Sequence, residues 1–276
     1  MSWCRILPSA AACLVCIGSS SATLVLLSQD APVPPPVAVP DPVSPKTDPV
    51  PSEPAKPAGP ADAKAEAAFA RMVRAYATAR SYEDTGEITT VFNGPNVNFA
   101  NLLRFSTKYE RPTRFRFEFS DIGPDGRTEK SHYVIWSAEA PERAKSWWTI
   151  QPKVSEVSMR QALGTAAGVS GRSSVNLPSL LMPGPRVEVP FGGMHDLKLG
   201  GEAEIEGVAC WWIDGKSRRG DPLAIWIDKD SSLVRKIVHQ FTIPGATKVE
   251  ATTIYRPKLD GPIPAEAFEF VPPANP

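Results

Sequence analysis

The sequence predicts a mainly β domain of the α+β class, built on one long antiparallel sheet. Three observations point to it. The hydrophobic period changes from helical to two after Ser81, short alternating segments follow with tight turns between them, and the alternation lapses between Ser155 and Met182. Short strands with tight connections favour a meander over the crossover units of parallel sheets. A sheet of about ten such strands is expected to twist and curl.

The first 28 residues are predicted to be a signal peptide or an N-terminal membrane anchor. Apolar and small residues dominate from Ile6 to Leu27, and no charged residue occurs between Arg5 and Asp30. A cleaved signal peptide, an uncleaved helical anchor and lipidation at Cys13 all fit this segment, and the three stay open. Each of them exports the domain to the periplasm or cell envelope, with membrane association through the N-terminus.

Residues 29–61 are predicted to form a proline-rich, disordered linker. Twelve of the 30 prolines lie between Pro32 and Pro60. Proline fixes φ and has no N–H to donate, so the segment favours extended polyproline II and serves as a stalk. Recognition of its proline motifs by a partner is the alternative. Residues 62–276 remain as one domain, long enough to fold without disulfides or metal.

Charge and cysteine content exclude two further features. Lys and Arg together equal Asp and Glu at 30 each, and no dense basic patch occurs, so no nucleic-acid binding is expected. Cys4, Cys13 and Cys16 fall in the N-terminal segment, which leaves Cys210 alone in the domain without a disulfide partner. We interpret Cys210 as a packed residue, with a reactive thiol as the alternative.

The domain is expected to begin with a helix over Asp62–Arg80. Alanine and long straight side chains favour helix there, and Asp62 is a suitable N-cap. One helical face collects four apolar side chains at the spacing i, i+3, i+4 and i+7: Phe69, Met72, Val73 and Tyr76. This stripe is predicted to pack on the core.

Strict alternation predicts the strands that follow. Phe115, Phe117 and Phe119 alternate with charged residues, and a strand from Phe99 to Tyr109 precedes them. One face of these strands is therefore buried and the other solvated, as in antiparallel sheets. Further strands are expected at residues 128–136, 145–150, 197–205, 208–213, 223–228, 233–243 and 247–255.

Helices are expected where the alternation lapses. Ser155–Leu163 has helical spacing and a capping residue, and Ser174–Met182 predicts a short second helix that ends at Pro183. The second helix carries an apolar cluster of Leu177, Leu180, Leu181 and Met182. This cluster either caps the sheet or covers a ligand cavity.

Short motifs run in a fixed order through nearly all of residues 65–273. They are Tyr76–Ser81, Gly86–Ile88, Phe115–Phe119, Glu206–Ile213, Leu223–Asp228, Leu233–Ile237, Tyr255–Pro257 and Ile263–Pro273. In this order they resemble the LolA/LolB-like lipoprotein-carrier superfamily, and more closely its uncharacterised predicted periplasmic members related to outer-membrane lipoprotein sorting. The resemblance implies a strongly curved antiparallel half-barrel whose concave apolar face is covered by a short helical lid. It also implies a carrier that holds acyl chains under that lid.

The domain is therefore expected to bind an apolar ligand, a lipid or a lipidated protein, as a carrier or sensor. Each buried CH₂ of a lipid chain contributes about 0.8 kcal/mol. The candidate lining residues are the inward strand aromatics and the lid cluster: Phe105, Phe117, Trp136, Trp148, Leu180, Leu181, Met182 and Trp226. The alternative is that these side chains fill an ordinary core, and that the domain is a structural or interaction module for cell-envelope partner proteins.

No catalytic signature occurs in the sequence. His132, His195 and His239 are far apart and lack metal-ligand spacing. Gly168–Gly171 lacks the spacing of a nucleophile elbow, and Asp228–Asp230 has the pattern of a hairpin turn. We therefore expect no enzymatic activity, no cofactor and no bound metal.

Overall fold

A computed structural model describes residues 60–95, 97–137, 143–182, 191, 193–243 and 246–274. Residues 55–276 form one compact unit. The predicted signal peptide or anchor, and all but the last two residues of the predicted linker, lie outside the described residues. Within the described ranges, none of the helices has the length and apolar character needed to cross a bilayer.

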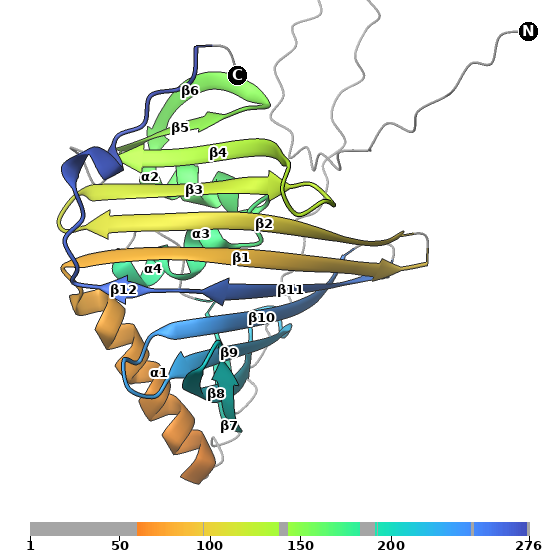
Figure 1. The fold of residues 1–276 in the computed structure, drawn as a ribbon. Coiled ribbons are helices and arrows are strands. Elements are labelled where there is room, and N and C mark those ends of the chain that lie inside the picture. Colours follow the sequence, from red (N-terminus) through yellow and green to blue (C-terminus); the bar gives the residue numbers. More distant parts are fainter. Residues whose placement is uncertain are drawn as a thin grey trace, which may run out of the picture. The chain divides into compact units, whose positions relative to one another are not determined.

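One antiparallel sheet of twelve strands carries the fold (Figure 1). Its strand order is β6-β5-β4-β3-β2-β1-β11-β10-β9-β8-β7, and β12 pairs with β1 beside this path. Two meanders therefore meet where β1 pairs with β11, and the predicted mainly β, antiparallel architecture is confirmed. The strands are β1 (Ser81–Gly94), β2 (Val97–Glu110), β3 (Arg114–Ile122), β4 (Glu129–Ser137), β5 (Arg143–Trp148), β6 (Gln151–Ser158), β7 (His195–Ile205), β8 (Val208–Lys216), β9 (Pro222–Asp228), β10 (Val234–Ile243), β11 (Thr247–Tyr255) and β12 (Lys258–Leu259).

The predicted N-terminal helix is present as α1 (Pro60–Thr78). Its buried residues recur every three or four positions, so one stripe faces the core: Ala65, Ala68, Met72 and Tyr76. The helix packs against β7 and β9. At its end the Tyr76 hydroxyl accepts a hydrogen bond of 3.0 Å from the Val234 N–H, which fixes the helix to β10.

The structure differs from the sequence prediction at residues 151–158. A helix was expected to start at Ser155, but Gln151–Ser158 forms strand β6 at the edge of the sheet, paired with β5. Helix α2 (Met159–Ala167) follows, and its N-cap is Ser158, whose hydroxyl accepts from the Gln161 N–H at 3.2 Å. Most of β6 is exposed, so it lacks the apolar alternation by which a half-buried strand is predicted.

Among the described residues between β6 and β7, three α-helices cover one face of the sheet (Figure 1). They are α2, α3 (Ser173–Asn176) and α4 (Pro178–Leu181), so the second expected helix is present as two short ones. Residues 159–182 are called the lid below. The lid shares one core cluster with Phe105 and Phe117, and the face of the sheet that bears these two residues is called the inner face.

Candidate functional site

The inner face is apolar where the lid covers it. Phe105 and Phe117 lie on neighbouring strands with ring centroids 6.3 Å apart, and both are buried. Leu180 and Leu181 of α4 are 2% and 0% exposed. At Gly171 an added Cβ would lie 3.0 Å from the Ile88 side chain, so the lid backbone rests directly on the sheet. A ligand on this face must therefore displace the lid.

Six of the eight residues predicted to line a cavity lie together at this interface between lid and sheet. Phe105, Phe117, Leu180, Leu181 and Met182 belong to its buried cluster, and Trp148 packs against that cluster. Trp148 pairs with Tyr133, and the two rings meet edge-to-face at 5.8 Å.

The sequence prediction placed Trp136 and Trp226 on the wrong face. Trp136 pairs with Arg116 on the opposite, outer face, where the Phe270 ring lies 5.2 Å away. Trp226 stacks on Trp212 at 5.7 Å, apart from the inner core cluster. Both tryptophans sit in runs that are buried on both faces, Val134–Trp136 and Ile225–Ile227, so alternation alone does not tell which side meets the lid.

Arg111 joins the lid to helix α1. From the turn after β2, its Nε donates to the Ala79 carbonyl at 2.6 Å, and its Nη2 donates to the carbonyls of Ala77 and, at 3.2 Å, Leu181. One planar guanidinium thus holds carbonyls at the C-terminal ends of α1 and α4 together. We call this group the Arg111 latch. Sequence reasoning missed it because an arginine before proline in a turn has the pattern of a solvated residue.

Asp84 is a charged residue buried at the base of the inner face, 1% exposed. Its Oδ2 accepts from the Tyr82 hydroxyl at 2.5 Å, and its Oδ1 accepts from the Thr107 N–H at 2.8 Å. Burial raises the pKa of the Asp84 carboxyl to about 7, although the hydrogen bonds from Tyr82 and Thr107 oppose this effect. Near neutral pH the carboxyl therefore changes charge inside the fold.

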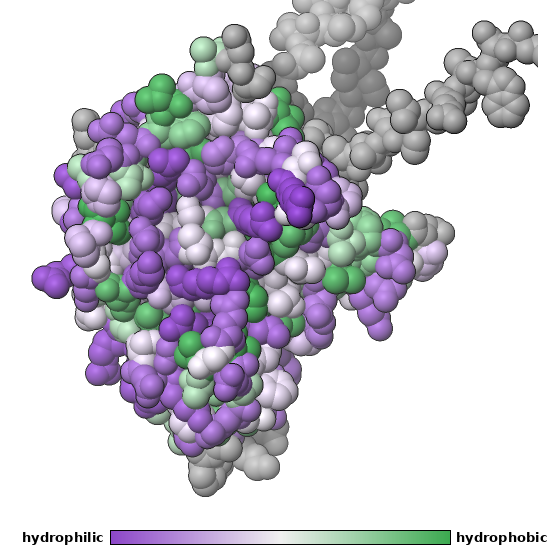
Figure 2. Space-filling view, in the orientation of Figure 1, coloured by the Kyte–Doolittle hydropathy of each residue, from purple (hydrophilic) through white to green (hydrophobic). Residues whose placement is uncertain are grey.

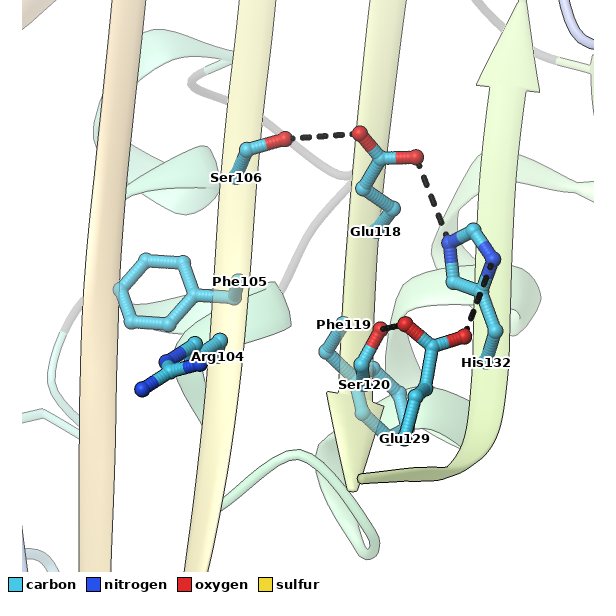
Figure 3. Close-up of a pocket in the computed structure, with 8 residues that line it drawn as sticks. All are labelled: Arg104, Phe105, Ser106, Glu118, Phe119, Ser120, Glu129 and His132. Carbon is cyan, nitrogen blue, oxygen red and sulfur yellow. Dashed lines mark hydrogen bonds and ion pairs between the residues drawn. The ribbon is translucent and has the colours of Figure 1, made fainter. Parts of the chain in front are cut away.

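A shallow pocket of about 280 Å³ lies on the sheet, with its polar residues on the outer face (Figure 3). Glu118 accepts from Ser106 and Arg116 and lies 3.4 Å from His132. Burial would raise the pKa of Glu118, but the hydrogen bonds from His132 and Arg116 dominate and lower it to about 2. The pocket is lined by Arg104, Phe105, Ser106, Glu118, Phe119, Ser120, Glu129 and His132.

The charged groups of this pocket are paired, either with one another or with a neighbouring residue of the sheet. Arg104 pairs with Glu87, and Glu129 accepts from Ser120 and lies 3.9 Å from His132. Such cross-strand pairs stabilise a sheet. Within the described ranges, no group of three or more His, Cys, Asp or Glu residues could hold a metal ion. We therefore interpret the outer pocket as a structural network.

The other residues singled out in the sequence lie apart from the interface of lid and sheet, except His239. Cys210 is a buried free cysteine, and burial raises its thiol pKa to about 11, as the packed interpretation expects. His239 lies on the inner face and His195 at an exposed strand end. Asp228 caps the 228–231 turn through its side chain and binds Arg235 at 2.8 Å. The prediction that the chain has no enzymatic activity stays a prediction.

Comparison with known proteins agrees with the resemblance in the motif order. Residues 168–276 match a family described as "Predicted periplasmic protein (DUF2092)", and the expected periplasmic location agrees with this description. Among curated proteins, no significant match occurs.

Solved structures with similar folds share few residues with this chain. A LolA superfamily protein of Nitrosomonas europaea is 11% identical, with a TM-score of 0.33, over 75% of this chain and 97% of its own. The Mycobacterium tuberculosis lipoprotein LppX is 14% identical, with a TM-score of 0.39, over 74% and 99%. A structure of the Pseudomonas aeruginosa MucA/MucB complex is 11% identical, with a TM-score of 0.39, over 75% and 61%. Likenesses of this size do not determine a ligand. The C-terminal part of the chain, residues 168–276, thus matches the predicted periplasmic family.

Proposed function

We propose that this protein is an exported, non-enzymatic carrier or sensor that binds a lipid, or the acyl chains of a lipidated protein, between the inner face and the lid. In this proposal the sheet curves into an open trough, the six inner candidate residues contact the acyl chain, and the packed lid is in its closed position. The observation that carries the proposal is a lid that packs on an apolar face and is held at one end by a polar latch, Arg111.

The energy of exchange supports such a mechanism. A chain with a dozen buried methylenes contributes about 10 kcal/mol at about 0.8 kcal/mol each. Uncovering Leu180, Leu181 and Met182 costs about 4.5–9 kcal/mol, because each large apolar side chain loses about 1.5–3 kcal/mol on exposure. An acyl chain that displaces these three side chains alone therefore replaces their contacts with a small net gain. A short or polar ligand does not.

Mass spectrometry of lipids extracted from the purified protein tests this proposal. We expect co-purified lipid in the wild type and in Val169→Glu, which adds a charge at a lid position that is 43% exposed. We expect none in Leu180→Glu, with folding checked by circular dichroism. Absence of lipid from the wild type, together with no uptake from phospholipid vesicles, would refute the proposal.

The β1–β2 hairpin supports a second function, docking of an envelope protein. Phe99 is 53% exposed and Val91 and Val97 are each 39% exposed, while Phe92 stacks on Phe99 at 4.5 Å. Figure 2 shows hydrophobic surface on this hairpin, which extends past the neighbouring strands in Figure 1. A photoreactive residue in place of Phe99 distinguishes the two functions. Protein adducts in cells without any co-purified lipid favour the second.

A further inference from the structure

The inner face is not uniformly apolar, because it encloses polar atoms that have no hydrogen-bond partner. Within the described ranges, six enclosed side-chain atoms lack a partner, and only Arg116 Nε belongs to an outer-face residue. In native structures nearly all enclosed polar atoms have a hydrogen-bond partner, so a concentration of unpaired atoms on one face needs an explanation. Besides the Tyr255 hydroxyl, they are Asn101 Oδ1, Asp121 Oδ1, Trp148 Nε1 and His239 Nε2.

The strand register puts these four residues in a band across the sheet. His239 pairs with Ala251, Ala251 with Thr90, and Thr90 with Asn101, so His239 and Asn101 lie in one cross-strand row. Asp121 pairs with Leu103, two residues along the same face of β2. Trp148 lies further along, on β5, opposite Tyr133. The four residues thus come from β10, β2, β3 and β5.

The lid reaches this band. An added Cβ at Gly171 would lie 3.9 Å from the Thr90 hydroxyl, in the row that links His239 and Asn101. Arg172 follows in a left-handed conformation with φ of 68°. Burial first, and then the Arg172 charge, lower the pKa of His239, so the lid arginine lies close enough to affect the band. A molecule held under the lid therefore meets polar groups as well as aromatic ones.

The chemistry of the band is specific. A carboxylate oxygen only accepts hydrogen bonds, and an amide oxygen does the same, so Asp121 Oδ1 and Asn101 Oδ1 both require donors. The indole N–H of Trp148 requires an acceptor. An ester-linked lipid without hydroxyl or N–H groups brings acceptors alone and leaves both oxygens unpaired. A hydroxyl or amide group beside the acyl chain supplies a donor for these oxygens as well as an acceptor for the indole N–H.

We propose that the ligand of this site is an amphiphile that carries hydrogen-bond donors, hydroxyl or amide, next to its acyl chain, and that Asn101 and Asp121 accept from them. The inference rests on the proposed carrier function and narrows it to a ligand class. It assigns the inner aromatics to the hydrocarbon and the polar band to the donor-bearing part.

Competition binding on the purified full chain tests the inference. The probe is 11-(dansylamino)undecanoic acid, and the two competitors share one acyl chain: 1-monopalmitoylglycerol has two hydroxyl groups, and methyl palmitate has none. We expect the wild type to prefer the glycerol ester about tenfold or more, since leaving a buried acceptor unpaired costs about 1–3 kcal/mol. Asn101→Leu and Asp121→Asn are each expected to reduce that preference severalfold. Asn98→Leu, at an exposed position of the same strand, is expected to keep it.

Each outcome has one meaning. If neither competitor displaces the probe, the carrier function fails and the inference fails with it. If both displace it within about twofold of each other, the carrier function stands and the donor requirement is wrong. Thermal unfolding of the ligand-free protein adds a second readout, because Asn101→Leu removes an unpaired buried acceptor and is expected to leave the melting temperature unchanged or raised. A clear drop in melting temperature would show that Asn101 is already satisfied, and would overturn the inference.

Discussion

Replacing Arg111 by lysine is expected to loosen the lid and the C-terminal end of α1, and to leave strand β2 unchanged. Lysine keeps the positive charge but has one nitrogen in place of the planar fork, so it cannot hold the carbonyls of Ala77, Ala79 and Leu181 together. Only the bond to Leu181 reaches the lid. The other two bonds hold the end of α1, where carbonyls lack partners within the helix.

The magnitude follows from that single bond. A hydrogen bond from a charged donor contributes about 1.5–3 kcal/mol, and the Leu181 contact is long, at 3.2 Å, and partly solvated. We therefore expect the closed lid to lose about 1–2 kcal/mol, which raises the population of the open lid about 5- to 30-fold.

Hydrogen exchange measured by mass spectrometry reads this population directly, because lid amides exchange through local opening. Peptides covering residues 173–182 are expected to exchange about 5- to 30-fold faster in Arg111→Lys, while those from β2 stay unchanged. Arg114→Lys is the matched control, since Arg114 bonds Glu110 at 2.9 Å on the sheet itself. Unchanged exchange in the lid, or equal acceleration throughout the domain, would refute the latch.

Three further changes test other parts of the fold. Asp84→Asn is expected to stabilise the protein above pH 7 by up to about 4 kcal/mol. It is also expected to flatten the loss of stability that the wild type shows as pH rises from about 4 to 7, measured by urea unfolding. In that window the native carboxyl still holds a proton that the unfolded chain has released, because its pKa is raised to about 7 in the fold. Gly86→Ala is expected to cost about 1–3 kcal/mol in the same assay, because a Cβ there would overlap the Phe105 ring and the Ile254 carbonyl oxygen. Phe270→Ala is expected to cost about 1–2 kcal/mol and to change tryptophan fluorescence, because its ring packs 5.4 Å from that of Trp147.

Clear results would contradict these expectations. A pH profile that stays equally steep in Asp84→Asn would place the titrating group elsewhere. Wild-type stability in Gly86→Ala would show that the sheet adapts at this position. An unchanged emission spectrum in Phe270→Ala would show that the C-terminal segment leaves the outer face in solution.

The sequence predicts most of this sheet because burial is one-sided where alternation is clean. Phe115, Phe117 and Phe119 alternate with Arg116 and Glu118, and the structure buries all three phenylalanines. Burial of one side of the strand sets both the two-residue period of apolar side chains and the face on which they lie, so both can be predicted there. The helix α1 is predictable for the equivalent reason, a stripe at helical spacing.

The candidate site is predictable only in part, because two of its determinants are not local. Trp136 is buried from outside by Phe270, which is distant in sequence, so its burial does not mark the inner face. The Arg111 latch depends on three backbone carbonyls at the ends of two separate helices. Every residue has a backbone carbonyl, so no pattern of side chains predicts which ones Arg111 will bind. Edge strand β6 is hard to predict because it is exposed on both faces, and exposure removes the alternation of apolar and polar residues that marks a half-buried strand.

The pairing of β1 with β11 has a consequence for the order of assembly. Gly86 lies opposite Tyr255, so the pairing that unites the two meanders needs β11, the last but one of the described strands. Contacts between such distant positions form slowly, because the chain loses the entropy of closing a long loop before the contacts stabilise it. A protein shortened after Ile243 would keep both meanders but lose the strand that joins them. The lid, encoded between the meanders, thus closes over a surface that is completed only by residues made after it.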